Sequence, residues 1–164
     1  IAIVGLKEQD IDSVWAALEM EPGFATGLCV RSVKACPGTT FCKRGQQDSL
    51  SVGLRLDAKY HGMELPSKFK MGVSGCPNQC AETCIKDVGL VGTAKGWNVL
   101  VGGNGGAKPR LGRELAKQLS TDEALELVEK VIEYYKANAR PYQRLGSMID
   151  KMGFEQFRAA VLGG

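Results

Sequence analysis

Two short pairs of cysteines constrain this 164-residue chain more than any other feature. The first pair lies in Cys36-Pro-Gly-Thr-Thr-Phe-Cys42 and the second in Cys76-Pro-Asn-Gln-Cys80. Four thiolates suit an iron–sulfur cluster or a zinc ion. Closed zinc sites favour about two to four residues between paired ligands, and the five residues inside the first pair exceed that spacing. The pattern therefore favours an iron–sulfur cluster, with zinc as the alternative.

The charge of the chain is too small to indicate a nucleic-acid partner. It carries 21 basic and 18 acidic side chains, a formal net charge of +3. Basic residues gather at Lys34, Lys43, Arg44, Lys68 and Lys70, without a repeated alternation with aromatic side chains that could stack on bases. A small anion is therefore the partner that this composition favours.

The chain shows neither a membrane span nor an export signal. No apolar run approaches the roughly twenty residues that cross a bilayer, and the signal-peptide pattern is missing. Six cysteines could form disulfides in a secreted protein. The Cys-Pro pairs and the cluster spacing instead predict a cytoplasmic protein with reduced thiols. Cys29 and Cys84 are expected to be small buried residues rather than ligands, although Cys84 follows Cys80 by one helical turn.

Hydrophobic periodicity predicts an α+β fold, a mixed sheet with flanking helices. At the N-terminus we expect a strand over Ile1–Gly5 and an amphipathic helix over Lys7–Met20. A capping box at Ser120-Thr-Asp-Glu123 predicts the start of a long helix. Further strands are expected at Leu28–Val33, Phe69–Val73, Val88–Val91 and Val99–Val101, and further helices at Gln46–Tyr60, Tyr142–Lys151 and Phe154–Leu162.

The segments around the cysteines contain further motifs in a characteristic order. Met71-Gly-Val-Ser-Gly75 leads into the second pair, and Asp87-Val-Gly-Leu-Val-Gly92 is followed by Trp97-Asn-Val-Leu-Val-Gly-Gly-Asn104. This order resembles the sulfite and nitrite reductases that contain sirohaem and a 4Fe–4S cluster, and in particular their small, single-unit members. The resemblance runs from about Arg31 to the C-terminus.

The resemblance implies two cofactors and a domain division. Residues 31–164 would bind sirohaem and the cluster, and residues 1–30 would be the C-terminal part of a ferredoxin-like half-domain that is truncated upstream. Asn78 would orient the cofactor or cap its loop. By the same resemblance, Cys80 would also bridge the cluster to the sirohaem iron, and the cluster ligands would be Cys36, Cys42, Cys76 and Cys80.

Three cations match the family positions that bind the substrate anion and aid proton delivery. They are Arg31, Lys68 and Lys70. Strand alternation places Lys68 and Lys70 on one face, as a pocket for an oxyanion requires. Taken without the neighbouring motif, the two lysines would more simply solvate a strand face.

A glycine-rich loop is the candidate site for the macrocycle. Sirohaem has a rim of carboxylates, which need donors and close backbone approach. Such a loop by itself is most often only a turn, but this one directly follows the Trp97 motif. The candidate residues are Gly103, Asn104, Lys108 and Arg110.

These features predict an oxidoreductase that reduces sulfite to sulfide with six electrons, which enter through the cluster. Reduction of nitrite to ammonia is the closest alternative, and a non-catalytic iron–sulfur electron carrier is the alternative from another class. No flavin or nicotinamide fingerprint is present, so an external donor such as ferredoxin is expected. A homodimer could reproduce the two related halves of the large family members.

Overall fold

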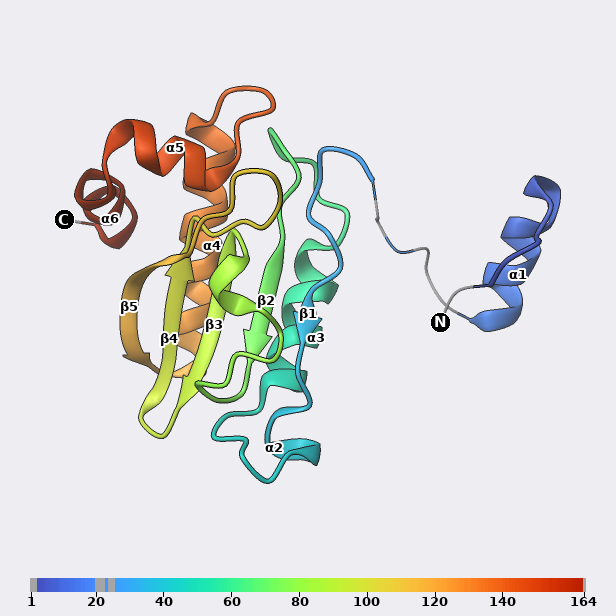
Figure 1. The fold of residues 1–164 in the computed structure, drawn as a ribbon, viewed down its shortest axis with the longest axis horizontal. Helices are drawn as coiled ribbons and strands as arrows, with labels where there is room; N and C mark the ends of the chain where they lie inside the picture. The colour runs from blue at the N-terminus through green and yellow to red at the C-terminus, as the bar shows by residue number, and fades with distance from the viewer. Residues whose placement is uncertain (1–2, 20–22, 24–25, 164) are drawn as a thin grey trace.

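The chain builds a five-stranded mixed sheet in the computed structural model, which describes residues 3–19, 23 and 26–163 (Figure 1). The strands are β1 (Lys34–Ala35), β2 (Met71–Ser74), β3 (Val88–Thr93), β4 (Gly96–Val101) and β5 (Arg113–Leu119). They follow one another across the sheet in chain order. The pairs β1/β2 and β2/β3 are parallel, and β3/β4 and β4/β5 are antiparallel. The predicted α+β class is confirmed.

One apolar core lies between a face of this sheet and the helices α3 (Ser49–Tyr60) and α4 (Thr121–Asn138). Val73 of β2 and Leu90 of β3 are fully buried, as is Val131 of α4. On the opposite face, Gly89 leaves no room for a Cβ beneath the Thr83 carbonyl, and a Cβ at its partner Gly72 would lie 2.9 Å from the Lys86 Cγ. The short helix η2 (Thr83–Ile85) can therefore lie directly on the strands.

The helices largely follow the sequence signals. The Ser120 hydroxyl accepts the Glu123 N–H, and the Glu123 carboxylate accepts the Ser120 N–H, so the capping box is confirmed. Helix α3 begins at Ser49 rather than Gln46, because the Asp48 carboxylate caps it by accepting the Ser51 N–H.

Of the last two helices, α6 (Phe154–Leu162) matches its prediction, and α5 (Leu145–Met152) begins three residues later than predicted. Tyr142 has a left-handed φ of 63°, which a continuing helix does not allow.

The strand predicted over Leu28–Val33 is wrong. This segment contacts two partners in turn: the Val30 N–H donates to Met63, and the Arg31 N–H donates to Phe69. Only isolated bridges form, and the regular strand begins at Lys34. Cys29 and Val30 are buried, but they are not part of a regular ladder.

Sequence analysis missed three elements, namely the short helices α2 (Gly38–Phe41) and η2 and the strand β5. Three charged side chains interrupt β5, namely Arg113, Glu114 and Lys117, which hides the alternation of a strand. Leu115 is nevertheless buried against the core. β5 is at the edge of the sheet, where charged residues commonly protect an unpaired strand.

The N-terminal helix stands apart from the sheet (Figure 1). It consists of η1 (Glu8–Asp10) and α1 (Ile11–Leu18), and it buries no residue. Met20, Ile1 and Ala2 lie outside the described residues, and the described part of the first predicted strand is not a strand. The division at residue 30 stays a prediction. No helix within the described ranges is both long and apolar enough to span a bilayer.

Candidate cofactor and anion sites

The two cysteine loops leave neighbouring parallel strands at the same end. Cys36 directly follows β1, and Cys76 is the second residue after β2. The strands pair in parallel with Ala35 opposite Val73. Their carboxyl ends therefore meet at one edge, which is where ligands commonly bind in sheets with parallel strands.

All four predicted cysteine ligands line one cavity of about 340 Å³. We call it the cysteine cavity. Cys42 and Cys80 are exposed, whereas Cys76 is buried. The predicted residue Asn78 also lines it. The remaining lining residues are Pro37, Gly38, Phe41, Lys43, Gly45 and Gly75.

Gly75 holds the two loops together through its backbone. Its N–H donates to the Cys36 Sγ at 3.1 Å, and its carbonyl accepts the N–H groups of Gln46 and Gln47. A Cβ at this position would lie 2.6 Å from the Gln47 carbonyl oxygen and 2.8 Å from the Gly38 Cα. Only glycine fits here, because both neighbours are backbone atoms.

The Cys36 thiol is prepared for deprotonation. Partial burial raises its pKa, but hydrogen bonds with the Gly75 N–H and the Ser49 hydroxyl outweigh burial, so its pKa lies below the usual value of a cysteine. A thiolate, rather than a thiol, is the species that ligates iron.

This arrangement fits a 4Fe–4S cluster. Four sulfur donors face a shared space, and tight backbone packing fixes the loops that carry them. In the part of the chain that the structure describes, no three His, Cys, Asp or Glu side chains are close enough to hold one metal ion. The thiols surround a volume instead, which is what a body of several iron and sulfur atoms requires.

The other two cysteines lie outside the cysteine cavity. Cys29 is buried, and Cys84 is partly buried with its carbonyl accepting the Gly112 N–H at 2.7 Å. Their placement agrees with packing roles for both side chains.

A second cavity, of about 390 Å³, lies at the amino ends of the same strands. We call it the basic pocket. Of the three predicted cations, Arg31 and Lys70 line this pocket and Lys68 does not. Phe69 is fully buried, whereas Lys68 and Lys70 on either side of it are both exposed. The two lysines therefore point away from the core. The other lining residues are Gly23, Ser32, Lys34, Met71 and Lys86.

Parallel pairing assembles this pocket from distant segments. Lys34 begins β1, Lys70 directly precedes β2, and Lys86 lies two residues before β3. These three amino ends are neighbours because the strands are adjacent and parallel. The four residues of β2 span roughly 13 Å, so the basic pocket and the cysteine cavity lie about one strand length apart.

A carboxylate that sequence analysis did not single out contacts two cations of the basic pocket. Glu82 pairs with Lys34 and with Lys86, each at 3.0 Å. Hydrogen bonds from Lys34 and Lys86 lower the pKa of the Glu82 carboxyl. The spacing of four residues between Glu82 and Lys86 was the available signal.

A buried ion pair between Asp87 and Arg144 contacts the backbone of the basic pocket at Lys70. Asp87 is fully buried and accepts two hydrogen bonds from Arg144, at 3.1 and 2.6 Å. It also accepts the backbone N–H of Lys70 at 2.8 Å. Burial raises the pKa of Asp87, and Arg144 opposes that rise. Sequence analysis treated Asp87 only as part of a motif.

The predicted macrocycle loop binds largely to itself. The Asn104 amide donates to the Lys108 carbonyl, and Arg110 donates to the Asn104 side-chain oxygen and pairs with Asp150 at 2.8 Å. A Cβ at Gly103 would lie 2.7 Å from the carbonyl oxygens of Cys84 and Lys86, so the loop packs on the η2 segment. A cofactor role for these residues stays a prediction.

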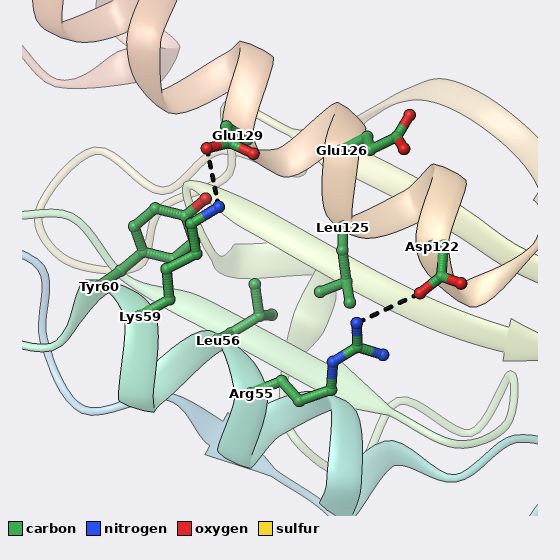
Figure 2. A pocket seen from close by; sticks show the side chains of 8 residues that line it. All are labelled: Arg55, Leu56, Lys59, Tyr60, Asp122, Leu125, Glu126 and Glu129. Atoms are coloured by element: carbon green, nitrogen blue, oxygen red, sulfur yellow. Dashed lines mark hydrogen bonds and ion pairs between the residues drawn. The ribbon is translucent and has the colours of Figure 1, made fainter.

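A third cavity, of about 390 Å³, lies between α3 and α4 (Figure 2), and no cysteine is among its lining residues. Ion pairs cross it between Arg55 and Asp122 at 3.2 Å, and between Lys59 and Glu129 at 2.7 Å. The paired charges indicate an interhelical contact rather than a binding site.

Comparison with known proteins agrees with this geometry. Residues 26–163 match the family model described as the nitrite and sulphite reductase 4Fe-4S domain. An assimilatory-type sulfite reductase of Nitratidesulfovibrio vulgaris is 47% identical over 163 residues, which cover 99% of this chain and 75% of the relative. A nitrite reductase [NAD(P)H] of Bacillus subtilis is 39% identical over 161 residues, which cover 98% of this chain and 20% of the relative.

The fold also occurs in solved structures. The crystal structure of dissimilatory sulfite reductase I superposes with a TM-score of 0.84 at 18% identity, over 95% of this chain and 57% of that chain. At this identity the match establishes the fold alone. The chain spans three quarters of the sulfite reductase but a fifth of the nitrite reductase.

Proposed function

Because the chain belongs to the nitrite and sulphite reductase 4Fe-4S domain family, we propose that it reduces sulfite to sulfide with six electrons that enter through its cluster. The chain is an oxidoreductase of the sulfite and nitrite reductase type, and membership of this family implies a 4Fe–4S cluster and sirohaem as cofactors. The preference for sulfite is supported by the 47% identity to a sulfite reductase that this chain covers over three quarters of its length.

The placement of four thiols around one cavity is the observation that carries this proposal. We assign Cys36, Cys42, Cys76 and Cys80 as the cluster ligands and Cys80 as the bridging ligand. When bound, the cluster and sirohaem supply the electrons and the iron that reduction requires. The protein contributes the thiolate cage and the charges around the anion.

The basic pocket supplies those charges. Sulfite takes up six electrons and six protons as its three oxygens leave as water, so negative charge must be offset and protons delivered repeatedly. Arg31 and Lys70 would bind the oxyanion, and the Lys70 ammonium would donate a proton; their shared place in the lining of the basic pocket supports these roles. The Lys70 backbone N–H donates to the buried Asp87 carboxylate at 2.8 Å, which holds the backbone at this point.

Two measurements test the proposal. Protein purified without oxygen should show sirohaem absorption in addition to the broad absorption of the cluster. With an artificial one-electron donor, it should reduce sulfite, and the sulfide formed should account for six electrons. Cluster absorption without sirohaem bands would instead identify an electron carrier.

Nitrite is the second candidate substrate. The family includes nitrite reductases, and the basic pocket would accept either small anion. The ratio of kcat/KM for sulfite to that for nitrite, measured with the same donor, decides between them. A higher value for nitrite would overturn the preference for sulfite.

Several further predictions complete the proposal. Gly103, Asn104, Lys108 and Arg110 would contact the sirohaem rim, and residues 1–30 would belong to a separate half-domain. The donor would be an external protein such as ferredoxin, and the protein would act in the cytoplasm. A homodimer remains part of the proposal, and light scattering of the cofactor-loaded protein tests it.

A further inference from the structure

Glu82 lies beside the basic pocket and contacts two of its cations. Its carboxylate is 3.0 Å from the Lys34 ammonium and 3.0 Å from the Lys86 ammonium. Among the described residues, it supplies the only carboxylate within 4.0 Å of either ammonium. Two of the four pocket cations therefore share one negative charge.

The backbone presents this carboxylate independently of the lysines. Glu82 has a left-handed φ of 56°, which is unfavourable for a residue with a Cβ. Its N–H donates to the Gln79 carbonyl at 2.8 Å, and its own carbonyl accepts the Ile85 N–H at 3.1 Å. The turn would thus keep Glu82 at the pocket after its ion pairs were broken.

The two lysines differ in how much they need a partner. The Lys86 side chain is only 10% exposed, whereas Lys34 and Glu82 are about half exposed, at 50% and 52%. A nearly buried ammonium requires a counter-charge. Either Glu82 or a bound anion can provide that charge for Lys86.

We propose that Glu82 is an internal counter-ion of the basic pocket, and that an oxyanion displaces it from Lys34 and Lys86 on binding. Glu82 then lowers the affinity of the basic pocket for anions, and it keeps the Lys34 and Lys86 side chains in place before an anion binds. This inference rests on the proposed function only for the identity of the oxyanion. Sulfite, nitrite and a rim carboxylate of sirohaem share the chemistry that the pocket recognises.

The test compares anion binding in three forms of the full-length chain: wild type, Glu82→Gln and Glu129→Gln. Glu129 is a matched control, because it forms a similar exposed pair with Lys59 at 2.7 Å in the cavity between α3 and α4. Sulfate binding is measured by calorimetry at low ionic strength, on cluster-bearing protein with and without sirohaem.

Glu82→Gln should bind sulfate about twofold to fivefold more tightly, as expected for release from a partly exposed ion pair. The difference should shrink at high salt, because screening weakens exposed pairs. Glu129→Gln should bind as wild type does, and Glu82→Asp, which keeps the charge, should lie between wild type and Glu82→Gln. Unchanged or weaker sulfate binding in Glu82→Gln would overturn the proposal, since a merely structural role predicts no gain.

The two forms of the protein identify the oxyanion. Tighter sulfate binding in both forms, with a lower KM for sulfite, assigns the pocket to the substrate. Tighter binding only without sirohaem assigns it to a cofactor carboxylate. Because sulfate binding needs no turnover, a protein that fails to reduce sulfite would refute the proposed function and leave this test intact.

Discussion

The cysteine cavity and the basic pocket lie at opposite ends of the same parallel strands, and they are built differently. The cysteine cavity is shaped by backbone atoms that pack closely around Gly75 and leave no room for a side chain there. Cations from three separate segments line the basic pocket, and Glu82 pairs with two of them. One region is fixed before its cofactor binds, whereas the other can exchange partners.

A single crossover between β2 and β3 links the two regions. It carries Cys76 and Cys80 at one end, Glu82 near its middle, and Lys86 and Asp87 at the other end. Two of the proposed cluster ligands and one cation of the basic pocket therefore depend on one short segment that is packed on the sheet through η2. The comparison predicts that substitutions at the cysteine end affect cofactor content, and those at the basic end affect anion chemistry.

The largest effect is expected for Cys80→Ser. A hydroxyl cannot replace a thiolate that ligates the cluster, so this variant should lose most of its iron and sulfide. Cys84→Ser should retain both, because Cys84 lies outside the cysteine cavity. Iron, sulfide and sirohaem content are measured in both variants. Equal loss in the two would contradict the ligand assignment.

Asp87→Asn tests the buried support of the basic pocket. It leaves the Arg144 guanidinium without its charged partner, and loss of one partner from a buried pair costs about 3–5 kcal/mol of unfolding free energy. Asp150→Asn, which breaks half-exposed pairs with Arg110 and Arg113, should cost about 1 kcal/mol or less. Urea unfolding measures both. Similar losses would mean that the Asp87 pair gives no special support.

Substitutions of Lys70 and Lys68 should differ in their effect on sulfite turnover. Lys70→Met should lower sulfite turnover about a hundredfold, because Lys70 lines the basic pocket and charge stabilisation there acts on the leaving oxygens. Lys68→Met should change turnover by less than about twofold, as surface substitutions usually do. Steady-state rates with an artificial donor give both values, and cofactor absorption should be retained. A reversed order would favour Lys68 as the substrate contact.

The smallest effect is expected for Gly75→Ala, which tests whether backbone contacts shape the cysteine cavity. Gly75→Ala inserts a Cβ against backbone atoms of Gln47 and Gly38, which should cost about 1–3 kcal/mol of stability and some cluster. At Gly105 the nearest atom to an added Cβ is the Ile85 Cδ1 at 3.7 Å, so Gly105→Ala should be nearly neutral. Denaturant unfolding and iron content distinguish the two. A neutral Gly75→Ala would show that the loops can adjust.

Much of the fold followed from local signals. The capping box at Ser120 and the period of the following apolar residues predicted α4, because both act within one helix. β5 was missed because its charged residues break the alternation, and only its pairing with β4 defines it as a strand. The segment before Lys34 was predicted as a strand from its apolar residues alone, but its hydrogen bonds go to two different partners, which only the tertiary structure reveals.

The sequence by itself determined the sulfur donors of the cysteine cavity, because each pair of thiols lies on one short loop, and their spacing favoured an iron–sulfur cluster over zinc. It also indicated a basic anion site and two of its cations, Arg31 and Lys70, but it did not assign Lys34 and Lys86 to that site. Only the tertiary structure brought Lys34, Lys70 and Lys86 together and left Lys68 outside, because the parallel register of β1, β2 and β3 decides which amino ends are neighbours. The burial of Asp87 and the contacts of Glu82 depend on the same packing.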